Sequence, residues 1–279
     1  MRYRTTAIGV LLAAALAVQA AQARSGVPSP IVFPVLGEVG YVDDFGQPRP
    51  GGKHQGNDLM APKKSIAVAA EGGKVKFWTT SANAGCMLYL YGDSGTTYIY
   101  IHLNNDVGMG NDNKGKCVPG TAYASGLQDG DTVAAGEPVG LVGDSGDANG
   151  IASHLHFEVH PHGGKAVSPY PFLQKAQHLF FSAVDGETFT LQLTGSVTGV
   201  ADDQLTVDVS LLREWPAHER VAKPGELTVT VPVERASIAA IEPGQIVTLW
   251  TERAPASLDA ELGNGLVATK LTVKPALKR

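Results

Sequence analysis

The chain has 279 residues, 43% of them hydrophobic, which is enough for one or two globular domains with a buried core. Its formal net charge of -5 excludes the basic surface that binding to nucleic acid or to anionic lipid requires. Only 7% of the residues are aromatic and 33 are glycine, a composition that favours β-structure with many turns.

The first 23 residues are predicted to be an export signal that is removed. Arg2 and Arg4 give a positive start, residues 7–18 are apolar, and residues 21–23 form a small-x-small cleavage pattern. A retained membrane anchor is the alternative, but the apolar run is shorter than the ~20 residues that a transmembrane helix needs. We therefore expect a mature chain without a stable membrane span, exported to the periplasm, the cell envelope or the extracellular space.

The remaining sequence predicts two domains, residues 24–178 and 179–279, and a mainly β fold class. In the first domain, strands are predicted at residues 74–78, 86–91, 96–103, 139–143 and 154–160. In the second, they are predicted at residues 188–198, 204–210, 226–233, 245–251 and 266–273. We expect an antiparallel β-sheet domain with an open groove, followed by a small C-terminal β-barrel or sandwich.

The two cysteines, Cys86 and Cys117, are predicted to form a disulfide bond, because an even cysteine count in an exported chain favours one. The bond would close a loop of about 30 residues and contribute roughly 3 kcal/mol to stability. Zinc ligation is the alternative, and the distance in sequence from the histidine-rich segments disfavours it. Residues 104–132 are predicted to be a long surface loop held at Cys117.

Three short segments carry residue types that suit a zinc ion bound by nitrogen and oxygen. They are His54-Gln-Gly-Asn-Asp58, Tyr100-Ile-His102-Leu and His154-Leu-His156-Phe-Glu158. A catalytic zinc site needs three protein ligands and one open position for water. The functional prediction therefore depends on whether these segments meet in space.

Strand alternation gives the last segment the strongest signal. In a strand, His154, His156 and Glu158 share one face, while Leu155 and Phe157 face the core. Two histidines on one face could both reach a metal ion or a substrate. Glu158 is then expected to orient a ligand histidine by a hydrogen bond.

The middle segment is weaker on its own. Alternation places Tyr98, Tyr100 and His102 on one face of their strand, and Ile99 and Ile101 on the other. A single histidine at a strand end is more often a hydrogen-bonded structural residue than a catalytic one. Only the neighbouring segments make it a candidate.

Together, the segments resemble the three signatures of the lysostaphin/LytM-type zinc metalloendopeptidases, which cleave peptidoglycan and have a duplicated hybrid motif fold. The intervening sequence agrees with the resemblance, including Gly136-Glu137-Pro138-Val139-Gly140 and Ser168-Pro169-Tyr170-Pro171. The match covers about residues 36–175. The last 100 residues lie outside it.

The resemblance implies two different roles for the four histidines and the aspartate of these segments. His54, Asp58 and His156 would bind Zn²⁺ with water in the fourth position, and His102 and His154 would be the catalytic pair. The implied activity is that of an exported zinc metalloendopeptidase that hydrolyses peptide cross-links of peptidoglycan. Which catalytic histidine acts as the base stays open.

Tyr100 is expected to donate a hydrogen bond to the oxyanion of that reaction. Two alternatives remain: a catalytically silent module that keeps the zinc site to bind cell wall or regulate an amidase, and a peptidase for another extracellular peptide. The C-terminal domain carries no chemical motif, and we expect it to contact substrate or a protein partner.

Overall fold

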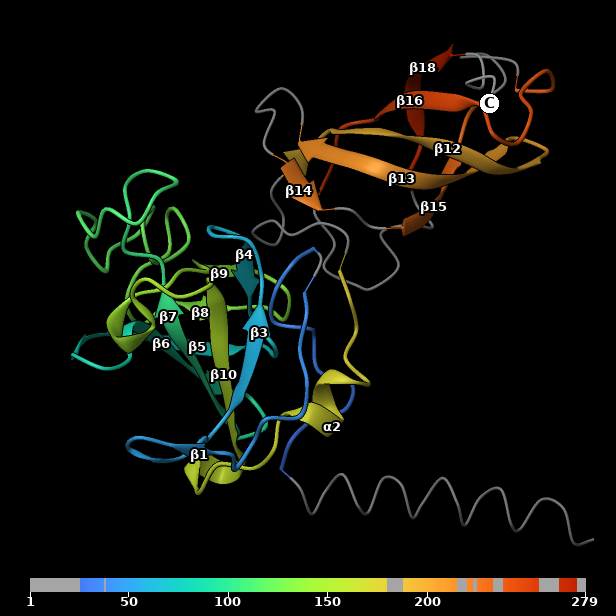
Figure 1. Ribbon diagram of the computed structural model, residues 1–279. Coiled ribbons are helices and arrows are strands. Elements are labelled where there is room, and N and C mark those ends of the chain that lie inside the picture. The colour runs from blue at the N-terminus through green and yellow to red at the C-terminus, as the bar shows by residue number, and fades with distance from the viewer. Residues whose placement is uncertain are drawn as a thin grey trace, which may run out of the picture.

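The computed structural model describes residues 26–37, 39–179, 188–214, 220–222, 225–232, 238–255 and 266–274. The predicted export signal at residues 1–23 lies outside these ranges. Strands dominate the described residues, which confirms the predicted fold class (Figure 1). No helix among them is long and apolar enough to cross a membrane.

A six-stranded antiparallel sheet in the order β3-β10-β7-β6-β5-β8 forms the framework of the part that contains the three histidine segments (Figure 1). Its strands are β3 (Asn57–Met60), β5 (Gly73–Ser81), β6 (Gly85–Gly92), β7 (Thr97–Leu103), β8 (Thr132–Val133) and β10 (His154–His160). Two smaller pairs are β1 (Pro48–Arg49) with β2 (Gly52–Lys53), and β4 (Ile66–Val68) with β9 (Pro138–Leu141). The short helices are η1 (Gly146–Ala148), η2 (Pro161–Gly163) and α2 (Tyr170–Leu173).

One face of the six-stranded sheet packs on the hydrophobic core. Leu155, Phe157 and Val159 of β10 are fully buried in it, as the alternation of that strand predicts. Their neighbours His154 and His156 therefore lie on the opposite face. The strand thus serves the core and the candidate site at once.

The alternation predicted for β7 is wrong beyond Tyr100. Tyr98 and Tyr100 do share a face, but it is the core face, and both are fully buried. His102 adopts a left-handed backbone conformation with φ of 62°, and Leu103 after it is also in the core. The irregular residue breaks the two-residue period, and β6 shows a register shift at the same place, between Cys86 and Leu88. The alternation of residue types in the sequence cannot reveal such a change in backbone conformation.

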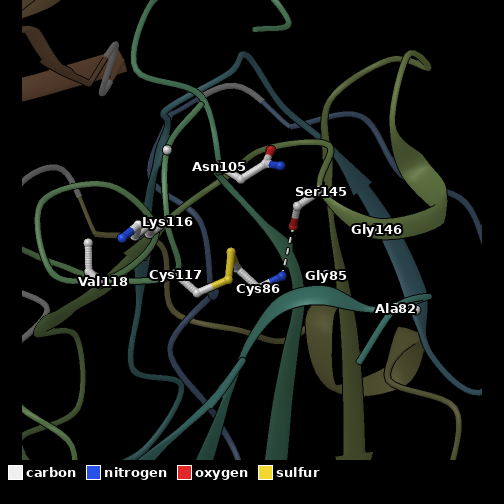
Figure 2. Close-up of a pocket in the computed structure, with 10 residues that line it drawn as sticks. Ala82, Gly85, Cys86, Asn105, Lys116, Cys117, Val118, Ser145 and Gly146 are labelled. Carbon is white, nitrogen blue, oxygen red and sulfur yellow. Dashed lines mark hydrogen bonds between the residues drawn. A yellow bond between two sulfur atoms is a disulfide. The ribbon is translucent and has the colours of Figure 1, made fainter. Parts of the chain in front are cut away.

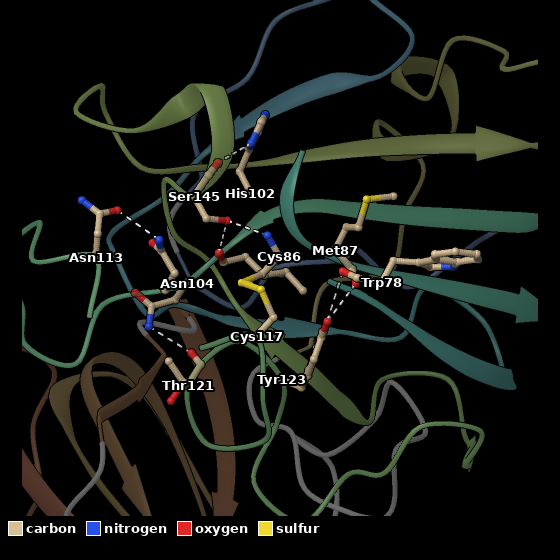
Figure 3. The surroundings of a disulfide bond; sticks show 12 residues. Trp78, Cys86, Met87, His102, Asn104, Asn113, Cys117, Thr121, Tyr123 and Ser145 are labelled. Atoms are coloured by element: carbon tan, nitrogen blue, oxygen red, sulfur yellow. Dashed lines mark hydrogen bonds between the residues drawn. A yellow bond between two sulfur atoms is a disulfide. The ribbon is translucent and has the colours of Figure 1, made fainter. Parts of the chain in front are cut away.

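The loop between β7 and β8 is held by the predicted disulfide bond, Cys86–Cys117, which is present (Figure 3). The loop is not entirely on the surface. Tyr123 is fully buried, stacks on Phe77 with ring centroids 3.7 Å apart, and donates a hydrogen bond to the backbone carbonyl of Met87. The loop therefore contributes a large aromatic side chain to the core.

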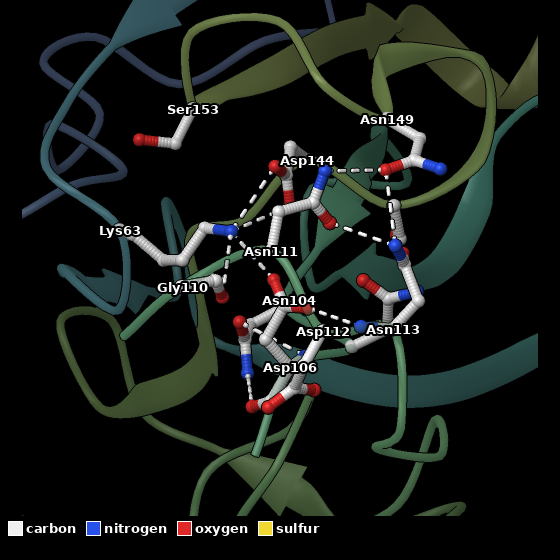
Figure 4. A network of polar contacts seen from close by, with 12 residues as sticks. Lys63, Asn104, Asp106, Gly110, Asn111, Asp112, Asn113, Asp144, Asn149 and Ser153 are labelled. Atoms are coloured by element: carbon white, nitrogen blue, oxygen red, sulfur yellow. Dashed lines mark hydrogen bonds and ion pairs between the residues drawn. The ribbon is translucent and has the colours of Figure 1, made fainter. Parts of the chain in front are cut away.

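A buried ion cluster fastens the start of the same loop (Figure 4). The ammonium group of Lys63 lies 2.5 Å from Asp106 and 3.0 Å from Asp144. The two carboxylates are almost completely buried, and the lysine side chain is only 13% exposed. Burial alone would raise the pKa of Asp106, but hydrogen bonds from Lys63 and from the Asn113 backbone hold it below its usual range.

The C-terminal strands form a separate antiparallel sheet with its own hydrophobic core. The sheet consists of β12 (Leu191–Ala201), β13 (Gln204–Glu214), β14 (Arg220–Ala222), β15 (Gly225–Thr230), β16 (Ile246–Thr251) and β18 (Ala268–Lys274). A further pair joins β11 (Thr188–Phe189) to β17 (Ala254–Pro255). The order of paired strands does not close into a barrel among the described residues, and a parallel bridge between Thr230 and Val267 joins the end of β15 to the segment before β18.

Replacing Lys63 by methionine should lower the free energy of unfolding by on the order of 3 kcal/mol. The reason is that two buried carboxylates would lose their shared cation. Urea denaturation of the purified protein measures this, with the exposed Lys175→Met as the control. Equal denaturation midpoints for the two variants would show that the cluster does not stabilise the fold.

Candidate metal centre and catalytic histidines

Three of the predicted residues converge on one point. His54 precedes β3, Asp58 lies in β3 and His156 lies opposite Asp58 in the neighbouring β10. Nε2 of His54 is 3.0 Å from Oδ1 of Asp58 and 2.8 Å from Nδ1 of His156, and the latter two atoms are 3.0 Å apart. The three donor atoms form a nearly equilateral triangle that could hold a metal ion.

The donor set suits zinc. Two imidazole nitrogens and one carboxylate oxygen are ligands that Zn²⁺ accepts, with bonds of about 2.0–2.2 Å. In a tetrahedral site, such bonds put ligand atoms roughly 3.3 Å apart. The observed edges are slightly shorter, so the triangle would need to open only slightly around an ion. Three ligands also leave the fourth tetrahedral position for water.

The ligand histidine His54 is fixed by the segment before the hairpin. Its Nδ1 donates to the backbone carbonyl of Asp44 at 3.0 Å, which leaves Nε2 for the metal. The carboxylate of Asp44 in turn accepts a hydrogen bond from the buried Asn57 at 2.8 Å. The sequence assigned no role to Asp44 or Asn57, because hydrogen bonds to a backbone carbonyl and between these two side chains cannot be seen in a sequence.

His156 is oriented by the carboxylate next to it on the open face. Its Nε2 lies 3.0 Å from Glu158, whose second oxygen lies 2.6 Å from Nε2 of His160. Glu158 therefore lies within hydrogen-bonding distance of both histidines. Burial alone would lower the pKa of His156, but hydrogen bonds to Asp58 and Glu158 outweigh it and raise the pKa to about 9.

Arg49 belongs to the site and was not anticipated. The turn of the β1–β2 hairpin brings its guanidinium to 2.8 Å from Oδ2 of Asp58, while Oδ1 faces the two histidines. It also lies 3.4 Å from Asp44. Burial would raise the pKa of Asp58, yet hydrogen bonds with His156 and His54 hold it far below the usual range. The residue thus stays a carboxylate, with one oxygen free for a metal.

The two other histidines form a second pair beside the triangle. The rings of His102 and His154 are 5.0 Å apart, and Nε2 of His154 is 3.8 Å from Asp58. Nδ1 of His102 donates to the carbonyl of Ser145 at 2.8 Å, and Nδ1 of His154 donates to that of Ala152 at 2.9 Å. Both anchored rings keep Nε2 for chemistry.

Burial, together with the smaller effect of the neighbouring His154, lowers the pKa of His102 to about 4. His102 is therefore neutral at physiological pH. A neutral imidazole whose Nδ1 carries the proton offers Nε2 as a proton acceptor.

Ser145 connects His102 to the disulfide bond (Figures 2 and 3). Its hydroxyl accepts a hydrogen bond from the backbone N–H of Cys86 at 2.9 Å and donates one to the carbonyl of Leu103 at 2.6 Å. A cavity of about 500 Å³ lies against this junction and is lined by Gly85, Lys116 and both cysteines, among others (Figure 2). The disulfide bond thus lies in the wall of a hollow next to a catalytic candidate.

Tyr100 is not in the site, and its predicted role at an oxyanion is wrong. Its side chain is fully buried on the core face of β7. Its hydroxyl donates to the carbonyl of Val68 and accepts from the backbone N–H of Ala70. With both hydrogen-bonding functions used inside the core, it cannot reach a substrate.

No family model matches the sequence. Solved structures to which it is similar include a lytM protein of Ruminococcus gnavus assigned as a glycyl-glycine endopeptidase, at 25% identity and a TM-score of 0.43. That match covers 55% of this chain and 62% of the other, less than two thirds of that protein's length.

Two further similar structures have higher coverage of the other chain. The catalytic domain of the antimicrobial peptidase lysostaphin from Staphylococcus simulans matches at 25% identity and a TM-score of 0.38, over 49% of this chain and 92% of that one. LytU matches at 27% identity and a TM-score of 0.38, over 49% and 86%. Because all three TM-scores lie below 0.5, the activity must follow from the chemistry of the site. Over about half its length, this chain is similar to LytM, lysostaphin and LytU structures.

Proposed function

We propose that this protein is an exported zinc metalloendopeptidase that hydrolyses peptide cross-links of peptidoglycan. The observation that carries the proposal is the convergence of three ligand atoms into a triangle with 2.8–3.0 Å edges. Beside it stand two histidines whose Nε2 atoms remain available. A hydrolytic metal site requires a complete set of ligands and a proton acceptor next to them.

In this proposal, His54, Asp58 and His156 hold the zinc ion. When bound, the metal would lower the pKa of a water molecule towards neutrality and polarise the scissile carbonyl. The protein's own contribution is to fix the ligands, through the carbonyl of Asp44 and the carboxylate of Glu158. Such partners set the tautomer and the direction of each ligand ring.

The two remaining histidines move protons. His102, kept neutral by burial, accepts a proton from the attacking water at Nε2. His154 stands closer to the ligand Asp58. Because its Nδ1 already donates to Ala152, its Nε2 carries a proton only when the ring is an imidazolium, and in that form it donates to the developing oxyanion or to the leaving amine. Ser145 and Ala152 hold the two rings so that these atoms need not reorient during the reaction.

The substrate class rests on the resemblance of the three signature segments to lysostaphin/LytM-type enzymes. An export signal at residues 1–23 and a disulfide bond agree with work outside the cytoplasm. We place the protein in the periplasm, cell envelope or extracellular space. The C-terminal sheet is proposed to contact substrate or a protein partner.

The purified mature chain should release new amino groups from isolated peptidoglycan, and mass spectrometry should show which peptide bond is cut. Chelation and His156→Ala should each lower the rate by at least on the order of a thousandfold, because both remove the metal. His178→Ala is a matched control, since His178 stacks on Phe33 away from the ligand triangle. Turnover that survives chelation would refute the metal mechanism.

The same experiment separates the proposal from a silent binding module. Stoichiometric zinc and binding to peptidoglycan without new amino groups would favour the module. Cleavage of other extracellular peptides but not of peptidoglycan would favour a peptidase with another substrate.

Arg49→Ala should weaken zinc binding by on the order of tenfold, because Oδ2 of Asp58 would lose its partner and the carboxylate could rotate. Removal of a cation favours zinc electrostatically, but the half-exposed guanidinium is screened, so we expect the orientation effect to dominate. Competition with a chromophoric chelator measures the affinity. Arg49→Gln keeps a donor and should recover part of it. Unchanged or tighter binding in Arg49→Ala would contradict this role.

Zinc binding should release about one proton from His156 at pH 7.5, in addition to protons lost by a water molecule whose pKa the metal lowers. In the metal-free protein, His156 is protonated below its pKa of about 9, whereas a zinc ligand must be neutral. Affinity should therefore fall as the pH drops below about 9 and level off above it. Calorimetry in two buffers of different ionisation enthalpy counts the protons. Glu158→Gln should reduce the release at pH 8, and no buffer dependence at pH 7.5 would contradict the raised pKa.

A further inference from the structure

We propose that the pocket next to His54 is a subsite for an acidic residue of the substrate, which therefore has a free carboxylate beside the scissile bond. This inference rests on the proposed function and specifies its substrate. It concerns the side of the metal centre away from the disulfide-lined cavity.

The pocket lies between two segments that are distant in the sequence. One wall comes from the hairpin region and contains Phe45, Lys53 and His54. The other follows β10 and contains His160 and Lys165. The cavity measures about 490 Å³, which is large enough for one amino-acid side chain.

The charge of the lining is one-sided. Lys53 and Lys165 line the pocket from its two segments, and no residue that lines it carries a carboxylate. Both lysines are exposed, and neither forms an ion pair with another described residue. A carboxylate placed between them would gain charge-assisted hydrogen bonds from both sides.

The acidic groups adjoining the pocket do not neutralise these lysines. Glu158 is occupied by His156 and His160, at 3.0 and 2.6 Å. Asp44, next to Phe45 in the sequence, is occupied by Arg49 and by Asn57. The positive charge of the lysines therefore remains available to a ligand.

The pocket also fixes where the acidic residue stands. His54 belongs both to the candidate ligand set and to the pocket wall, so the pocket borders the metal centre. A peptide residue spans about 3.4 Å. The side chain that enters the pocket therefore belongs to a residue beside the bond that is cut. Phe45 provides apolar surface for its aliphatic stem.

Two cross-linked peptides that are identical except at one position test this subsite. In one, the side-chain carboxyl of the residue beside the scissile bond is free, and in the other it is amidated. The wild-type protein should cleave the free acid with a kcat/KM on the order of tenfold higher at low salt. The preference should shrink as salt screens the charges.

The double variant Lys53→Gln, Lys165→Gln should lose this preference mainly through a higher KM for the acid. Its kcat, its zinc content and its kcat/KM for the amidated peptide should stay near wild-type values. Lys175→Gln, also exposed but outside the pocket, is the matched control and should behave like wild type.

Equal cleavage of both peptides by wild type, or a preference that survives in the double variant, would overturn the subsite. These outcomes leave the zinc peptidase itself intact. Failure of wild type to cleave either peptide or isolated peptidoglycan would instead refute the proposed function.

Discussion

The placement of β10 between β3 and β7 is the constraint on which the candidate site depends. Antiparallel pairing puts His156 opposite Asp58 on one side and opposite Ile101 on the other. A shift by one residue would turn the polar set of β10 into the core. The buried Leu155 and Phe157 prevent this, because they would then face the open side. The register of β10 that buries its apolar side chains is therefore the same register that positions the metal ligand His156.

The histidines of the site share one arrangement, in which one ring nitrogen is tied to a fixed acceptor. For His54, His102 and His154 the acceptor is a backbone carbonyl, and for His156 it is the carboxylate of Glu158. A carbonyl cannot change its protonation, so it fixes the tautomer permanently. A carboxylate adds negative charge, which makes its histidine more basic. The ligand with the carboxylate partner, His156, thus has the raised pKa, which makes its binding to a metal depend on pH.

The long loop contributes rigidity on the other side of the site. It is held by the disulfide bond at Cys117, by the Lys63 cluster and by Tyr123 in the core. The disulfide partner Cys86 also meets Ser145, which holds His102. A short chain of hydrogen bonds therefore connects the disulfide bond that holds the loop to the ring of His102.

The sequence by itself determined the longer strands, the disulfide bond and the parity of β10, because alternation and cysteine count are local signals. It also identified the ligand segments through their resemblance to known signatures. Only the tertiary structure decided that Tyr100 is a core residue, since the left-handed His102 breaks the alternation that placed both on one face. Only it brought Arg49 to Asp58, because a hairpin turn and a carboxylate's second oxygen leave no pattern in a sequence. Side-chain contacts that depend on an irregular backbone residue or on a hairpin turn follow no sequence periodicity. Such contacts can therefore be found only in the tertiary structure.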